Sequence, residues 1–107
     1  TDTESTMTEI APVTPGEMLQ EEFLTPLGLT AYRVAKDIGV PETRMYDILA
    51  GKRAITAETD LLLCRYFGLT DGWWLAVQAH HAIAIARREL KQRLHKVPRC
   101  PRLTEAA

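Results

Sequence analysis

The side chains best suited to chemistry lie in the stretch DIGVPETRMYDILAGKR, residues 37–53. One helical pattern ends at Gly39 and another begins at Pro41, so the turn between the two helices is very short. After this turn, the polar residues that point outward are Glu42, Thr43, Arg44, Tyr46 and Asp47. Their side chains supply the hydrogen-bond donors and acceptors that read base edges in the major groove of DNA. The chemistry that this stretch predicts is recognition by hydrogen bonding.

The short turn predicts a particular pairing of helices. Two helices joined by a turn of about three or four residues that contains Gly form the helix-turn-helix arrangement, whose second helix enters the major groove. From the spacing alone, an ordinary helical hairpin with a solvated face remains the alternative.

Capping residues and apolar spacing predict five helices around this turn, and no alternating strand pattern occurs in the sequence. In the first helix, Thr14, Pro15 and Glu17 form a capping-box signature, and Pro26 is expected to end the helix. The fold class is therefore all-α, a bundle with a long C-terminal helix. The expected helices run from Thr14 to Pro26, Thr30 to Gly39, Pro41 to Gly51, Thr56 to Gly68, and Thr70 or Asp71 to about Leu94.

The last of these helices carries two apolar stripes, about 200° apart. The first can pack on the bundle and contains Trp74, Gln78, His81 and Ile85. The second suggests contact with another chain, as a dimer or with a partner protein, and contains Ile83, Arg87, Leu90 and Leu94. The alternative is that both stripes belong to the core of a wrapped helix.

Length and composition indicate one compact domain, because the chain has 107 residues of which 46% are hydrophobic. We expect a flexible N-terminal arm over residues 1–13, the helical domain over 14–95 and a flexible basic tail over 96–107. No apolar run approaches the roughly 18 residues of a membrane span, so a cytoplasmic protein with no membrane contact is expected. Cys64 and Cys100 favour a reducing compartment, although a bond between them stays open.

The charges are unevenly distributed along a chain whose net charge is only −1. Residues 1–22 contain six acidic residues and no Lys or Arg, whereas residues 87–102 contain seven basic residues and only Glu89 as an acid. The two ends therefore carry opposite electrostatic fields.

Enzymatic and metal-binding functions find no support in the sequence. It has no Gly-rich phosphate loop, no nucleophile motif and no metal-ligand spacing among His80, His81, His95 and Cys100. Trp73 and Trp74 are expected to anchor packing rather than to form a cofactor cage. We expect no catalysis, no cofactor and no metal.

Four segments carry a resemblance that covers roughly residues 14–89: PGEML, EFLTPLGLT, GKRAIT and WWLAVQA. The chain resembles the HigA-type, or VapI-type, branch of the Xre family of λ-repressor-like helix-turn-helix proteins. The resemblance implies an antitoxin of a HigBA-type type II toxin–antitoxin module. Such a protein binds its own promoter as a homodimer, represses its operon and neutralises a HigB-like toxin, a RelE-like protein that cleaves mRNA. Where the family commonly has Gln, this chain has Glu42, which bears on the operator sequence.

Matched to the family pattern, the outward residues of the second helix would contact bases, with Thr43 and Arg44 as the best candidates. The full set is Glu42, Thr43, Arg44, Tyr46 and Asp47. The residues that would meet DNA phosphates are Thr30, Arg33, Lys52 and Arg53. A solvated surface is the alternative for each of these charges. The acidic N-terminal region is the expected contact for a basic toxin. Two other functions stay open: a stand-alone regulator without a toxin, and a toxin-binding module with little DNA affinity, which the acidic Glu42 and Asp47 favour.

Overall fold

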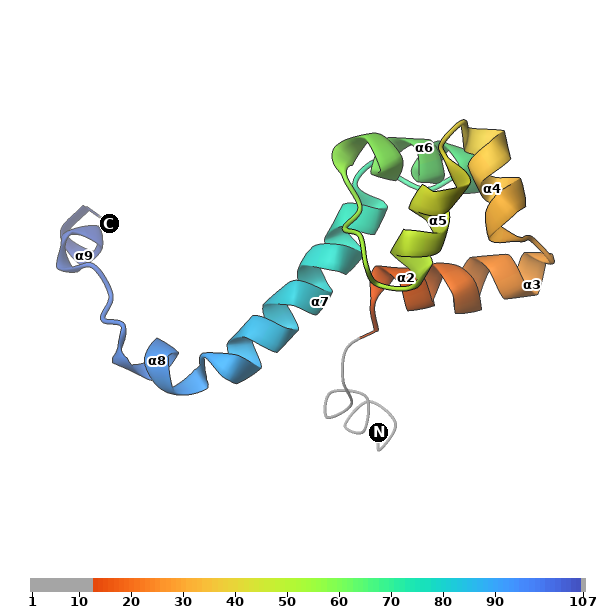
Figure 1. Cartoon of the computed structure of the whole chain (residues 1–107). Coiled ribbons are helices and arrows are strands. Elements are labelled where there is room, and N and C mark those ends of the chain that lie inside the picture. Colours follow the sequence, from red (N-terminus) through yellow and green to blue (C-terminus); the bar gives the residue numbers. More distant parts are fainter. Residues whose placement is uncertain (1–12, 107) are drawn as a thin grey trace, which may run out of the picture.

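A computed structural model describes residues 13–106, with side chains through residue 103. These residues form seven helices and no strand, which confirms the all-α class (Figure 1). The first is continuous and comprises α2 (Pro15–Met18), the π-helical turn η1 (Leu19–Leu24) and α3 (Thr25–Leu27). The others are α4 (Ala31–Ile38), α5 (Glu42–Leu49), α6 (Ala57–Phe67), α7 (Trp73–Glu89), α8 (Lys91–Lys96) and α9 (Pro101–Ala106). Apart from Val13, the expected N-terminal arm lies outside the described residues.

Local capping chemistry sets the helix ends where the sequence predicted them. The hydroxyl oxygens of Thr14, Thr30 and Thr56 each accept a hydrogen bond from the backbone N–H three residues later, at 3.0, 3.1 and 3.4 Å. Gly39 and Gly68 end α4 and α6 in the left-handed conformation, with φ of 78° and 69°. These positions confirm the boundaries of α4 and α6 and the start of α2.

The first helix does not stop at Pro26, as we expected, but continues to Leu27 and ends at Gly28 in the left-handed conformation. A proline inside an α-helix clashes with the carbonyl four residues earlier. Here Pro26 follows the π-helical turn η1, in which the N–H of Thr25 bonds to the carbonyl of Gln20, five residues back. The wider turn gives a physical reason why the helix passes through the proline.

The core lies between the first helix, α4, α5, α6 and the start of α7. Its largest buried side chain is Trp74, which is fully inaccessible. Trp74 packs edge-on against Trp73 with ring centroids 4.8 Å apart, and its ring is tilted against that of Phe23 with centroids 5.1 Å apart. Both tryptophans therefore anchor packing, as predicted. The other fully buried apolar side chains are Leu19, Leu24, Val34, Met45, Ile48, Leu63 and Cys64.

Gly16 sets the distance between the first helix and α5. It is buried, and a Cβ placed on it would lie 2.3 Å from the carbonyl oxygen of Ile48 and 2.7 Å from that of Leu49. Both atoms belong to the backbone at the C-terminal end of α5, so no side chain can turn aside to make room. Only glycine permits this close approach.

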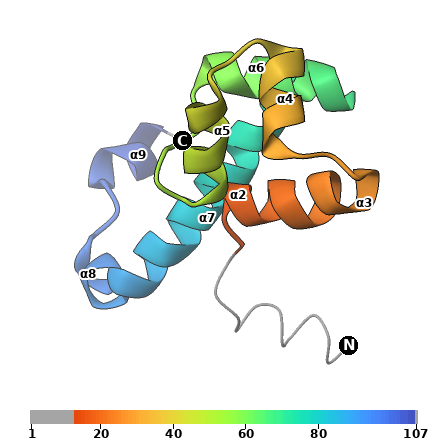
Figure 2. The ribbon, with the colours of Figure 1, turned by 45° about the vertical axis from the view of Figure 1, so that its right-hand side comes forward.

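The helix α7 leaves the bundle and carries α8 at its far end (Figures 1 and 2). We expected one helix to about Leu94, but α7 ends at Glu89 and the backbone bends at Leu90, where φ is −100° and ψ is 9°, before α8 begins. No Gly or Pro marks this position, and the bend lies where the helix no longer packs on the bundle. The helix α8 then ends before Pro98, whose preceding residue Val97 is extended.

The segment expected to be a flexible tail contains the short helix α9, so it is not wholly irregular. Cys64 is buried, Cys100 is exposed, and both are free thiols. Among the described residues, no helix is both long and apolar enough to cross a membrane.

We predict that Gly16→Ala lowers the free energy of unfolding by about 1–3 kcal/mol, because the added methyl group forces the backbones of α2 and α5 apart. Chemical denaturation followed by circular dichroism measures the effect. Glu21→Ala, at an exposed position of the same helix, is the matched control and should change stability little. Equal denaturation midpoints for the two variants would contradict the close packing at Gly16.

Candidate nucleic-acid interface

A three-residue turn, Gly39–Pro41, joins α4 to α5. The N–H groups of Gly39 and Val40 both bond to the carbonyl of Ala35, at 2.9 and 3.0 Å, and so close the end of α4. Pro41 has an extended backbone and precedes the first residue of α5. The two helices pack on each other directly after the turn. This is the helix-turn-helix geometry that the spacing predicted.

The second helix of this pair, α5, has an inner and an outer face. Met45 and Ile48 are buried, with 0% and 2% of their surface exposed. Glu42, Thr43 and Tyr46 lie on the opposite side and are exposed. The structure thus brings three of the five candidate base-reading residues onto one open face, where their polar atoms are available to a ligand.

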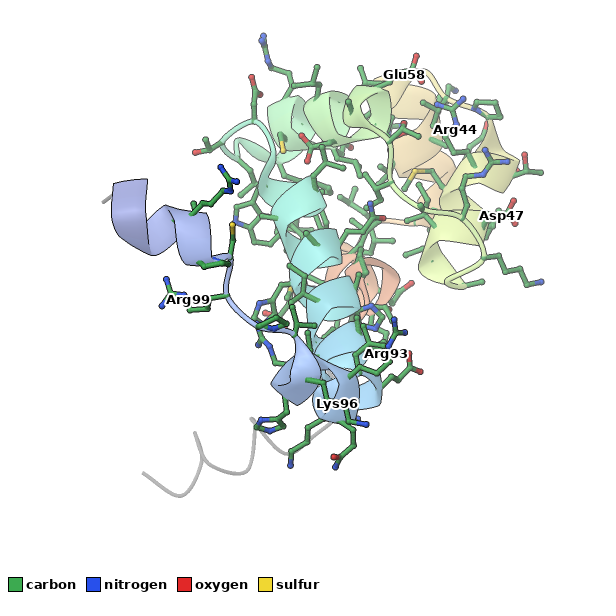
Figure 3. The ribbon with its side chains drawn as sticks, turned by 90° about the vertical axis from the view of Figure 1, so that its left-hand side faces the viewer. Arg44, Asp47, Glu58, Arg93, Lys96 and Arg99 are labelled. Carbon is green, nitrogen blue, oxygen red and sulfur yellow. The ribbon has the colours of Figure 1, made fainter. Side chains whose placement is uncertain are left out.

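The other two candidates on α5, Arg44 and Asp47, are only partly exposed and take part in ion pairs (Figure 3). Arg44 donates to the carboxylate of Glu58, in the first turn of α6, at 2.8 Å. Arg53, a candidate phosphate contact, lies 3.8 Å from the carboxylate of Asp47. Each pair sets a cation of the candidate interface against a carboxylate, which reduces the positive charge of this face.

Arg33, another candidate phosphate contact, is also ion-paired. Its Nε donates to Asp37 one turn later in α4, at 3.2 Å. The phenol of Tyr66 in α6 donates to the same carboxylate oxygen at 2.5 Å. The hydrogen bond from Tyr66, assisted by the nearby Arg33 and Lys36, lowers the pKa of Asp37. The same bond raises the pKa of Tyr66. Thr30 and Lys52 complete the candidate phosphate set, and both are exposed.

Asp60 is a structural residue of the site that the sequence reading missed. It is only 1% exposed, and its carboxylate accepts hydrogen bonds from the backbone N–H groups of Gly72, Trp74 and Leu75, at 2.7, 2.8 and 3.0 Å. It therefore caps α7 from a neighbouring helix, since Gly72 has no side chain with which to do so. The sequence contained a signal for its burial, because Asp60 lies three residues before the core residue Leu63 and so on the same face of the helix.

Gln78 was predicted to face the bundle, but its role was not foreseen. Its Oε1 accepts from the N–H of Ile55 at 2.6 Å, and its Nε2 donates to the carbonyl of Ile55 at 2.9 Å. This pair of bonds ties α7 to the loop after α5, which carries Lys52 and Arg53. A polar residue on an inward stripe must find a hydrogen-bond partner, and the sequence could not say which.

The expected second stripe of the C-terminal helix faces away from the bundle. Ile83 and Leu94 have 52% and 50% of their surface exposed, Arg87 is exposed and Leu90 is half-buried. The bend at Leu90 means that these four residues do not follow one straight helix. Within the described residues, no group of three or more His, Cys, Asp or Glu side chains is placed to hold a metal ion.

The turn, the buried inner face of α5 and its open outer face define a helix-turn-helix protein. No protein-family model matches the chain. Virulence-associated protein I of Dichelobacter nodosus is 40% identical over 81 residues, which cover 76% of this chain and 75% of that protein. Antitoxin HigA-1 of Vibrio cholerae is 36% identical over 76 residues, which cover 71% of this chain and 70% of that protein.

A solved structure gives the same relationship in three dimensions. The Pseudomonas aeruginosa antitoxin HigA, solved with the higBA promoter, superimposes with a TM-score of 0.74 at 27% identity, covering 81% of this chain and 96% of that chain. The chain belongs to the family of HigA antitoxins and virulence-associated protein I, which are helix-turn-helix proteins. The family resemblance expected from the sequence is confirmed.

We predict that Tyr66→Phe raises the pKa of Asp37 towards its ordinary value, because the variant keeps the ring and loses the phenol donor. A carboxylate with a lowered pKa stabilises the fold above its ordinary pKa, and the contribution is lost as the pH falls through the lowered value. The stability difference between wild type and variant should therefore shrink as the pH falls through the pKa of Asp37.

Carbon NMR titration of the Asp37 carboxyl group measures this shift. Tyr32→Phe, at an exposed tyrosine of α4, is the matched control and should leave the Asp37 titration unchanged. If Asp37 titrates at the same pH in all three proteins, the hydrogen bond from Tyr66 does not set its pKa.

Proposed function

We propose that this chain is the antitoxin of a HigBA-type module: a cytoplasmic homodimer that binds operator DNA, represses its own operon and neutralises a RelE-like toxin that cleaves mRNA. The observation that carries the proposal is the exposed face of α5, the second helix of the helix-turn-helix. On this face Glu42, Thr43 and Tyr46 are directed outward. The function requires binding surfaces only, so the chain performs no catalysis.

Ion pairs offset two of the carboxylates at the interface. Asp47 is one of the two acidic residues that favoured a module with little DNA affinity, and its charge is offset by Arg53. In the same way, the carboxylate of Glu58 is offset by Arg44. A relative solved with the higBA promoter has the same fold, which supports the proposal. Docking of α5 in the major groove, as in other helix-turn-helix proteins, would place its outer face against the bases and would bring Thr30, Arg33, Lys52 and Arg53 to the phosphates.

Two surfaces suit the proposed protein partners. The first helix exposes Glu17, Glu21 and Glu22, and a ribonuclease toxin needs a basic surface to hold RNA, so opposite charges would speed association. The exposed stripe of Ile83, Arg87, Leu90 and Leu94 suits a second copy of the chain. A dimer is needed because one helix reads too few base pairs to select an operator.

The central prediction is that the protein is a dimer in solution and selects an inverted repeat. The two half-sites should be centred about 34–36 Å apart, one turn of DNA, because a symmetric dimer places its two α5 helices in successive major grooves. Sedimentation measures the assembly, and binding to a randomised DNA pool and to the promoter of its own operon measures the selection.

Three outcomes would contradict parts of the proposal. If the protein is a monomer at micromolar concentration and does not bind promoter DNA, the proposal of a DNA-binding dimer is wrong. Selection of an operator with no toxin encoded beside the gene would indicate a stand-alone regulator. Co-purification with a co-expressed neighbouring toxin, without any DNA binding, would indicate a protein-interaction module.

The base preference of the site should depend on Glu42, which is exposed in the first turn of α5. Pairing with Arg44, one alternative role for Glu42, is not observed, because Arg44 binds Glu58 instead. A carboxylate only accepts hydrogen bonds and so favours the N4 amino group of cytosine, whereas the amide of Gln pairs with adenine.

We therefore predict that Glu42→Gln raises affinity for DNA in general and shifts one position in each half-site from cytosine towards adenine, by about 1–3 kcal/mol. Selection of operators from a randomised pool by both proteins provides the measurement. Glu22→Gln removes the same charge from an exposed position of the first helix and should keep the wild-type preference. Identical preferences for wild type and Glu42→Gln would show that Glu42 reads no base.

A further inference from the structure

Residues 87–102, which we call the basic extension, are the most strongly charged surface among the described residues. This segment begins in the last turns of α7, includes α8 and ends at the second residue of α9. Its only acidic residue is Glu89, and among the described side chains, residues 13–103, no ion pair involves any of its cations. Those exposed cations are Arg87, Arg88, Lys91, Arg93, Lys96, Arg99 and Arg102.

The helix-turn-helix face, in contrast, is almost neutral. Its five cations are Arg33, Lys36, Arg44, Lys52 and Arg53, and they stand among the four carboxylates of Asp37, Glu42, Asp47 and Glu58. Three of the five are ion-paired there, at 2.8 to 3.8 Å. Sequence-independent affinity for DNA comes from cations that replace the counterions of phosphates. This face therefore offers hydrogen bonds for reading bases but little net charge for holding the backbone.

The fold holds the basic extension apart from the rest of the chain. In Figure 3, Arg93, Lys96 and Arg99 lie on α8 and the segment after it, away from Arg44 and Asp47. Arg93 and Lys96 are three residues apart and so share one face of α8. Long side chains on a projecting segment can reach a stretch of DNA phosphate backbone that the bundle itself does not contact.

We propose that the basic extension is a second DNA contact, which binds the phosphate backbone of duplex DNA beside the base pairs read by α5, without regard to sequence. The inference rests on the proposed function, because it adds to a DNA complex made by the helix-turn-helix. Because the basic extension is strongly positive, charge complementarity favours a polyanion as its partner. An anionic membrane fits less well, because α8 has only one apolar residue, Leu94, and hence no apolar face to insert.

The test uses the full-length triple variant Arg93→Gln, Lys96→Gln, Arg99→Gln. Fluorescence anisotropy measures its affinity, at several salt concentrations, for an operator duplex extended by flanking base pairs. Loss of three phosphate contacts from each protomer of the proposed dimer, six in all, should lower the slope of log affinity against log salt by about 5.4, since each contact contributes about 0.9. The preferred operator sequence should stay the same.

Two controls separate charge from folding and assembly. The charge-preserving variant Arg93→Lys, Lys96→Arg, Arg99→Lys should keep the wild-type slope. Sedimentation should show the same assembly for all three proteins. If the triple variant assembles differently, the single variants Arg93→Gln and Arg99→Gln replace it, and each should lower the slope by about 1.8, because both protomers lose one contact.

The outcomes distinguish this inference from the proposed function. A wild-type slope in the triple variant, with operator selection intact, overturns the second contact and leaves the proposed function standing. A second outcome would also overturn the DNA contact: the triple variant keeps the wild-type salt slope for DNA but loses a wild-type affinity for vesicles of phosphatidylserine and phosphatidylcholine. That outcome would assign the basic extension to membrane binding. If the wild-type protein binds no DNA at all, both proposals fail.

Discussion

The position of α7 depends on one carboxylate from another helix. Asp60 on α6 accepts three backbone hydrogen bonds at the start of α7, where Gly72 supplies no side-chain cap. Its negative charge also lies at the positive end of the α7 dipole. Removing the carboxylate would leave buried N–H groups without partners, which is costly in a protein interior. This interaction places Trp74 in the core and directs the rest of α7 out of the bundle.

Two further constraints fix α5 relative to this frame. Gly16 allows the first helix to approach the C-terminal end of α5 at backbone distance. Gln78 then holds the backbone of Ile55 through two hydrogen bonds, so the loop after α5 is tied to α7. The outer face of α5 is therefore held by contacts on both sides of the helix. Such support matters for recognition by hydrogen bonding, because small displacements weaken directional bonds.

The charges divide the molecule into two regions with different physical character. Around α5, cations and carboxylates are closely paired, as in Arg44 with Glu58 and Arg53 with Asp47. Such pairing suppresses unselective attraction to phosphates and leaves selectivity to hydrogen bonds. Along the basic extension seven cations stand with the single acid Glu89, and no ion pair involves them among the described side chains. A chain with a net charge of −1 can in this way concentrate positive potential on one projecting segment.

The sequence by itself determined what depends on neighbouring residues. Caps such as Thr30, the left-handed Gly39 and the inner face of α5 were all predictable, because each arises within about one helical turn. The exposure of Glu42, Thr43 and Tyr46 followed from the same periodicity, whereas Arg44 and Asp47 are only partly exposed. Only the tertiary structure decided that Arg44 turns to Glu58, that Asp60 caps α7 and that the last helix bends. These features join residues far apart in the chain or depend on where the helix stops packing on the bundle. A local sequence pattern does not say which distant residue will be the partner of a side chain.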